Sequence, residues 1–168
     1  MDARIFEIVS YAILKAYYSE QIIYWDWNFN DLTEENLKLY KTGRTNANDG
    51  GIDFVMKPLG RFFQVTETLD INKYFLDIDK IQRYPITFVI KTEKSENEIL
   101  KKIEENAINT YTVKAIVKRY MDSIEEIINI SNLQIILNKL IQDGKTKEIM
   151  DEIILQSKVE FNYDENDD

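Results

Sequence analysis

The chain contains no cysteine and no histidine. Without cysteine it forms no disulfide, and without either residue it holds no structural zinc of the Cys/His kind. Nucleophilic systems of the Ser-His-Asp and Cys-His types are excluded on the same ground. Any catalysis must therefore use carboxylates, amides, lysine, tyrosine or a hard metal ion bound through oxygen.

Glycine and proline are also scarce, with five and two residues in 168, which argues against a loop-rich architecture. No apolar run approaches the ~20 residues of a membrane span, and no charged segment precedes a short apolar stretch as in a signal peptide. The 44% of hydrophobic and 30% of charged residues are typical of one globular domain. We therefore expect a cytoplasmic protein with no membrane partner.

The formal net charge of −9 speaks at first against a nucleic-acid partner. The distribution of charge weakens that argument. Residues 160–168 carry five acids and no base, whereas basic residues outnumber acidic ones within 36–62 and 111–121. Because local fields steer ligands more than the total charge does, DNA remains open as a partner.

Residue periodicity predicts a helix followed by strands in the first half of the chain. Apolar residues at helical spacing indicate a helix over 2–19, and the β-branched and aromatic segment 21–27 indicates a strand. A short helix is predicted within 30–40. Strands at 51–57 and 61–67 flank a Pro-Leu-Gly turn and predict a β-hairpin.

The second half is expected to be mostly helical. A helix over 70–84 and a buried strand over 85–92 follow the hairpin, and a strand–helix–strand order implies a crossover and a parallel strand pair. Further helices are predicted over 95–109, 111–129, 131–142 (capped by Ser131) and 144–157.

The fold class is therefore α/β, with a small mixed sheet flanked by helices. We divide the chain into an α/β core at 1–94 and a helical extension packed on that core at 95–159. The acidic residues 160–168 are expected to form a disordered tail.

Asp53 is the leading candidate for a functional carboxylate. It lies in the first hairpin strand after two glycines, which allow close approach to its backbone. A two-residue hairpin loop places Asp53 opposite Gln64 on the facing strand. A three-residue loop with a bulge places it opposite Val65 and brings Glu67 onto its face. The sequence does not choose between these registers, so Gln64 and Glu67 remain alternatives for one role.

These residues and the order of elements resemble the PD-(D/E)XK nuclease superfamily, particularly the restriction-endonuclease type. The resemblance covers roughly residues 4–92 and runs helix, three strands, helix, strand. Members carry an Asp on one hairpin strand and an acid-or-Gln, any residue, Lys pattern on the next. Here GGID supplies Asp53, and Gln64-Val65-Thr66 occupies the second pattern. Many members also place a Glu on the first helix, where this chain has Glu7.

The resemblance implies a Mg²⁺ (or Mn²⁺) ion held by Glu7 and Asp53, with Gln64 or Glu67 completing the site directly or through water. Glu67 is therefore a candidate metal ligand as well as a candidate catalytic residue. Oxygen ligands of this kind suit a hard divalent cation, which polarises a phosphoryl oxygen and lowers the pKa of an attacking water.

One position departs from the family pattern, because Thr66 stands where the family has lysine. Threonine supplies no positive charge. Lys57 shares the face of Asp53, but four residues along a strand is ~13 Å, too far for one metal site. Lys91, on the strand after the crossover, is the substitute we predict.

Two groups of residues are candidates for DNA contact. Arg44, Asn46 and Asn48 lie in a polar loop that suits phosphate or base contacts, and Lys114 and Lys118 form a pair one helical turn apart.

The function implied is a Mg²⁺-dependent endonuclease of the restriction type, a hydrolase acting on double-stranded DNA. A homodimer is expected, with the C-terminal helices as its candidate interface, because palindromic sites suit symmetric dimers. The alternatives are a catalytically inactive nuclease-fold module for DNA binding or assembly, and a protein-interaction domain that uses the apolar C-terminal helices.

Overall fold

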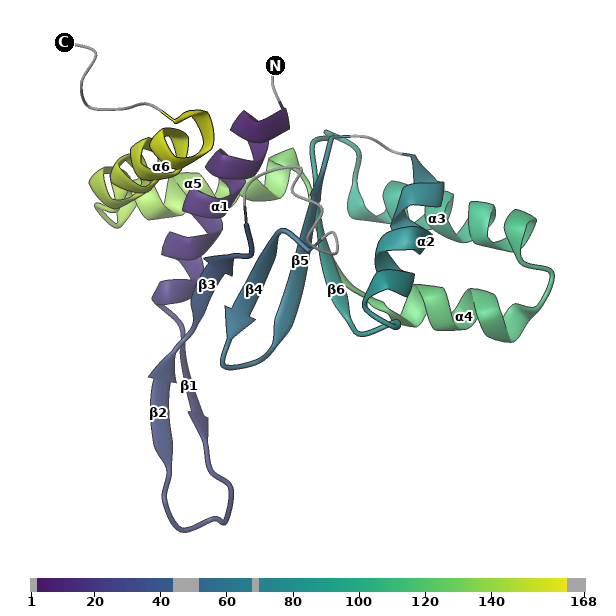
Figure 1. Ribbon diagram of the computed structural model, residues 1–168, viewed down its shortest axis with the longest axis horizontal. Helices are drawn as coiled ribbons and strands as arrows, with labels where there is room; N and C mark the ends of the chain where they lie inside the picture. Colours follow the sequence, from purple (N-terminus) through teal and green to yellow (C-terminus); the bar gives the residue numbers. More distant parts are fainter. Residues whose placement is uncertain (1–2, 44–51, 68–69, 163–168) are drawn as a thin grey trace.

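The structure is a computed structural model and describes residues 3–43, 52–67 and 70–162 (Figure 1). In these ranges the chain forms a mixed α/β fold, as the periodicity predicts, with a five-stranded sheet in the order β3-β4-β5-β6-β7. The strands are β3 (Lys38–Lys41), β4 (Phe54–Lys57), β5 (Arg61–Thr66), β6 (Ile86–Ile90) and β7 (Ile124–Ile128).

Helices cover both faces of this sheet and enclose two hydrophobic clusters. On one face, α1 (Ala3–Ser19) packs with α5 (Ile130–Gln142) and α6 (Thr146–Phe161). On the other lie α2 (Ile71–Lys80), α3 (Glu96–Thr110) and α4 (Lys114–Asp122) (Figure 1). Strand alternation explains the division, since Val89 of β6 joins the α1 cluster while Phe88 and Ile90 join the α2 cluster.

The predicted hairpin and crossover are confirmed. Strands β3, β4 and β5 run antiparallel to one another, and β6 runs parallel to β5 after the α2 connection. Phe54 pairs with Phe63, and Met56 pairs with Arg61. This is the register of the two-residue loop, which aligns Asp53 with Gln64 rather than with Val65.

The helix predicted within 30–40 is wrong, because this segment forms β2 (Thr33–Asn36) and β3. Leu37 and Leu39 alternate with exposed residues and bury their side chains under α1, where the Tyr11 hydroxyl donates to the Leu39 carbonyl at 3.1 Å. That period of two is a strand pattern, and burial against α1 outweighs the helix-forming composition. The first strand of the main sheet is therefore β3.

The strand predicted over 21–27 exists as β1 (Ile22–Trp25), but it pairs only with β2 in a separate two-stranded sheet. Figure 1 shows this hairpin projecting from the body of the molecule. Its side chains remain largely solvent-exposed, with Trp27 and Phe29 almost fully so.

The segment 95–159 is not wholly helical, and the helix predicted over 111–129 is wrong in its second half. It ends at Asp122 as α4, and the following residues form β7, which pairs in parallel with β6. Ile127 and Ile128 are buried there, one in each cluster, so the strand closes the sheet between the two layers of helices. Helix α6 extends through Phe161, so residues 160 and 161, assigned to the acidic tail, are helical.

Within the described ranges, no helix combines the length and apolar character needed to cross a membrane.

Asn129, rather than the predicted Ser131, caps α5. The Asn129 side-chain oxygen Oδ1 accepts the backbone N–H of Asn132 at 2.8 Å, and the side-chain nitrogen Nδ2 donates to the Lys94 carbonyl at 2.8 Å. Asn129→Ala should therefore lower the free energy of unfolding by about 1–2 kcal/mol, measured by urea denaturation. Asn138→Ala, at an exposed position inside the same helix, is the matched control and should leave it within about 0.5 kcal/mol. Equal losses in both variants would contradict the capping role.

Candidate active site

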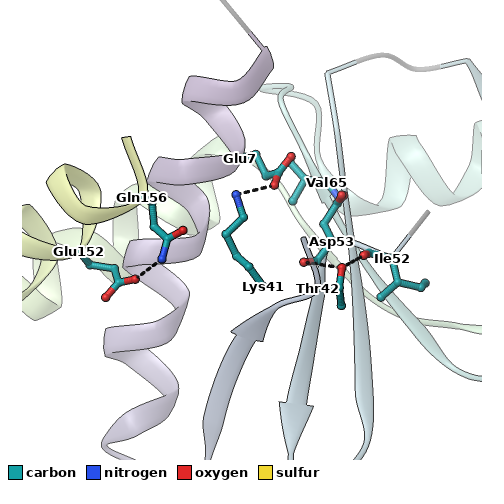
Figure 2. Close-up of polar contacts among 8 residues, drawn as sticks. All are labelled: Glu7, Lys41, Thr42, Ile52, Asp53, Val65, Glu152 and Gln156. Carbon is teal, nitrogen blue, oxygen red and sulfur yellow. Dashed lines mark hydrogen bonds and ion pairs between the residues drawn. The ribbon is translucent and has the colours of Figure 1, made fainter. Parts of the chain in front are cut away.

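Two acids and one lysine from separate elements meet beside α1. Glu7 lies on α1, Lys41 is the last residue of β3, and Asp53 immediately precedes β4. Figure 2 shows their side chains gathered between α1 and the ends of these strands. Glu7 lies near enough to Asp53 for its charge to raise the pKa of the Asp53 carboxyl.

Glu7 is held by a buried ion pair. The Lys41 Nζ lies 2.9 Å from the Glu7 Oε1, and the two side chains are only 9% and 6% exposed (Figure 2). The α1 register explains the burial, because Glu7 follows Phe6 and precedes Ser10 and Tyr11 on the face packed against the sheet. Buried charges are costly unless paired, so each of these groups depends on the other.

Asp53 is fixed by its neighbours on both sides. Its carboxylate accepts the Val65 N–H at 2.7 Å, and its own N–H donates to the Phe63 carbonyl at 3.0 Å. On the other side, the Thr42 N–H donates to the Asp53 carbonyl at 3.0 Å. These contacts hold the carboxylate in one position, as a binding or catalytic group requires.

The pKa of Asp53 is raised to about 7, chiefly because burial disfavours the carboxylate and next because Glu7 carries a like charge. Asp77 raises the pKa further, whereas the Val65 hydrogen bond and the charge of Lys41 lower it. A carboxyl group poised near neutrality by burial and a like charge is characteristic of functional sites.

Gln64 lies on β5 between Phe63 and Val65, the two residues that bind Asp53. Because these two pack in the α1 cluster, alternation turns the Gln64 side chain to the α2 face. The side chain is buried, and its Oε1 has no hydrogen-bond partner among the described residues. A buried side-chain oxygen without a partner is uncommon in proteins and is a candidate ligand for water or a cation.

Glu67 and Lys91 form a second ion pair with each other. The Lys91 Nζ lies 5.9 Å from the centre of the Phe6 ring. In the described part of the chain no three acidic side chains come close enough to hold a metal together, so Glu67 does not join Glu7 and Asp53. The register and this pairing both favour Gln64 over Glu67 as the residue beside Asp53.

Of the five candidate DNA-binding residues, the structure describes Lys114 and Lys118. Arg44, Asn46 and Asn48 lie outside the described residues. Lys114 and Lys118 are exposed on α4, across the sheet from α1 (Figure 1), and Lys118 pairs with Asp122. Any contact they make with DNA would therefore lie away from Glu7.

Sequence reasoning missed Lys41 as a site residue. The sequence pattern that could have identified Lys41 is the spacing of Leu37, Leu39 and Lys41 at every second residue, which places all three on one face of a strand. The segment was interpreted as a helix, so this face was not recognised.

The residues present fit a divalent cation. Glu7 and Asp53 supply two carboxylates. Gln64, aligned with Asp53 by the strand register, adds a buried amide oxygen without a partner, directed to the α2 face. Mg²⁺ and Mn²⁺ prefer such oxygen ligands. A cation bound beside Asp53 would offset the burial and the like charge of Glu7, which together raise the pKa of the Asp53 carboxyl.

Comparison of the chain with protein-family models, with curated protein sequences and with solved structures found no match.

Proposed function

We propose that this protein is a Mg²⁺-dependent DNA endonuclease of the restriction type, with a site of the PD-(D/E)XK kind. The observation that carries the proposal is the approach of two acids, the buried Glu7 on α1 and the partly buried Asp53 just before β4, with Lys41 paired to Glu7. Burying two carboxylates close together costs free energy, and a cation bound between them would offset that cost.

The topology supports the proposal. Apart from the separate hairpin β1-β2, helix α1 is followed by the antiparallel strands β3-β4-β5, then by α2 and the parallel strand β6. This is the order helix, three strands, helix, strand that the resemblance implies, with β3 in place of the segment 21–27. The arrangement places the start of β4 and the end of β3 beside the N-terminal half of α1.

In this proposal Glu7 and Asp53 hold the metal, and Gln64 is the third candidate oxygen donor. When bound, such an ion would polarise a phosphoryl oxygen and lower the pKa of an attacking water. The Val65 N–H fixes the Asp53 carboxylate. The apolar side chains of the α1 cluster limit the access of bulk water to the acids.

Double-stranded DNA is the proposed substrate, and a cytoplasmic homodimer is the proposed assembly. Helices α5 and α6 are the candidate interface because they expose several large apolar side chains: Ile135, Ile141, Met150, Ile154 and Leu155.

A second candidate function is a nuclease-fold module that binds DNA or mediates assembly without cutting. Thr66 favours it, because the residue at the lysine position is buried and uncharged. The two functions differ in metal binding, since only the enzyme needs Asp53 to hold a divalent cation.

The test is incubation of the protein with supercoiled plasmid and mixed-sequence linear DNA in Mg²⁺ or Mn²⁺, with EDTA as the control. We expect discrete cleavage products that require the metal, and calorimetry should show Mn²⁺ binding to the protein alone. Mn²⁺ binding without cleavage of any DNA would favour the inactive module. Absence of both would reject the proposed metal site.

A further inference from the structure

If the site is a nuclease centre, it needs a positive charge on the scissile phosphate that Thr66 does not supply. Lys91 is a weak source, because it already pairs with Glu67 beside Phe6. Within the described ranges, neither Lys91 nor Glu67 forms a hydrogen bond or ion pair with Asp53. Lys41, in contrast, belongs to the same cluster as the two acids.

The position of Lys41 is fixed by its strand. It pairs with Phe54 across β3 and β4, so it lies one residue from Asp53 on the neighbouring strand. The next residue, Thr42, donates its N–H to the Asp53 carbonyl. The ammonium reaches Glu7 at 2.9 Å and lies near enough to Asp53 to lower the pKa of that carboxyl.

Lys41 and a divalent cation require the same carboxylate. In the metal-free protein the ammonium neutralises Glu7. A cation bound to Glu7 and Asp53 would repel the ammonium at short range, because like charges interact strongly in a partly desolvated site.

We propose that Lys41 is a counter-ion which a divalent metal displaces from Glu7, and that the released ammonium binds the scissile phosphate in place of the lysine missing at Thr66. This inference rests on the proposed function and names the residue through which metal binding prepares the site for DNA.

The chemistry of lysine suits this exchange. Its ammonium is a compact charge on a flexible four-carbon stem and can change partners without moving the backbone. A buried ammonium that loses its carboxylate needs another anion, and a phosphate oxygen of DNA provides one. Metal binding would thus leave the Lys41 ammonium without a partner until a DNA phosphate binds at the same site.

The test compares Lys41→Met with Lys15→Met. Lys15 is the matched control because it also forms an ion pair, with Glu152 at 2.7 Å, and lies outside the candidate site. Because methionine removes the competing charge, Mn²⁺ should bind Lys41→Met at least about tenfold more tightly than the wild type, measured by calorimetry without DNA. At saturating Mn²⁺ the same variant should cleave DNA on the order of 10²–10³-fold more slowly in single turnover. Lys15→Met should change neither the affinity for Mn²⁺ nor the cleavage rate by more than a few-fold.

Tighter metal binding combined with slower cleavage separates this role from a structural one, since simple loosening of the site weakens both. Unchanged or weaker Mn²⁺ binding by Lys41→Met, or cleavage at the wild-type rate, overturns the inference while leaving the proposed function in place. Wild-type protein that binds no Mn²⁺ rejects the proposed function, and this inference with it.

Lys41→Met leaves Glu7 buried without its partner, which can prevent folding. A second experiment therefore uses the folded wild-type protein. Mg²⁺ is titrated against the protein while the side-chain εCH₂ resonances of lysine are followed by NMR, with Lys41→Arg used for assignment. The Lys41 resonance should shift with Mg²⁺ occupancy, and that of Lys15, which pairs with Glu152, should not. A stationary Lys41 resonance in protein that binds Mg²⁺ rejects the displacement.

Discussion

Asp53→Asn is expected to reduce DNA cleavage on the order of 10³-fold, because it removes one of the two carboxylates that would hold the metal. The amide can still accept the Val65 N–H, which is 2.7 Å from the carboxylate in the structure, so the fold should be retained. Single-turnover cleavage of plasmid in Mg²⁺ measures the loss of rate, and Mn²⁺ calorimetry measures the loss of metal affinity.

The same variant should be more stable than the wild type at pH 8 in EDTA. The pKa of Asp53 is raised to about 7 in the folded protein, against about 3.9 in an unfolded chain. The folded state therefore binds more protons between these values, and the contribution of Asp53 to stability is lost as the pH rises from about 4 to about 7. Asparagine has no such loss, so the gain reaches up to about 4 kcal/mol above pH 7 and vanishes near pH 4.

Urea unfolding at several pH values checks this result, with Asp31→Asn as the control because Asp31 is exposed on the projecting hairpin. The control should match the wild type at every pH. If Asp53→Asn cleaves DNA normally, Asp53 does not belong to the site. If it is less stable than the wild type at pH 8, the carboxylate supports the fold instead of straining it.

Phe54→Ala should lower the free energy of unfolding by about 3–5 kcal/mol. Phe54 is fully buried, with its ring 5.2 Å from that of Tyr11 on α1 and 6.5 Å from that of Phe63 on β5. Its removal leaves a cavity between α1 and the sheet, one residue from Asp53. Chemical denaturation gives the loss directly, and weaker Mn²⁺ binding should accompany it as Glu7 and Asp53 lose their fixed spacing.

Phe29→Ala is the matched control for this substitution. Phe29 is 99% exposed on the projecting hairpin, so the same truncation should change stability by no more than about 0.5 kcal/mol. A cost for Phe54→Ala below about 1 kcal/mol would show that α1 is not held on the sheet by this packing.

The sequence predicted well wherever one local pattern acted alone. Helical spacing identified α1, the Pro-Leu-Gly turn between β-branched and aromatic residues identified the hairpin, and the next strand identified the parallel pair. It failed at 30–40 and at β7, where residues of good helix propensity are held in strands. There Leu37, Leu39, Ile127 and Ile128 are buried against helices distant in sequence, and that burial outweighs local preference.

The same division applies to the candidate site. The absence of cysteine and histidine restricted the chemistry to oxygen ligands and lysine, and the residues around Asp53 and Gln64 indicated where that chemistry would lie. Only the tertiary structure decided which lysine approaches the acids and which acid pairs elsewhere: Lys41 binds Glu7, and Lys91 binds Glu67. The physical reason is that a charge interacts over a few ångströms with whatever packing brings near it, whereas residue patterns report only neighbours along the chain.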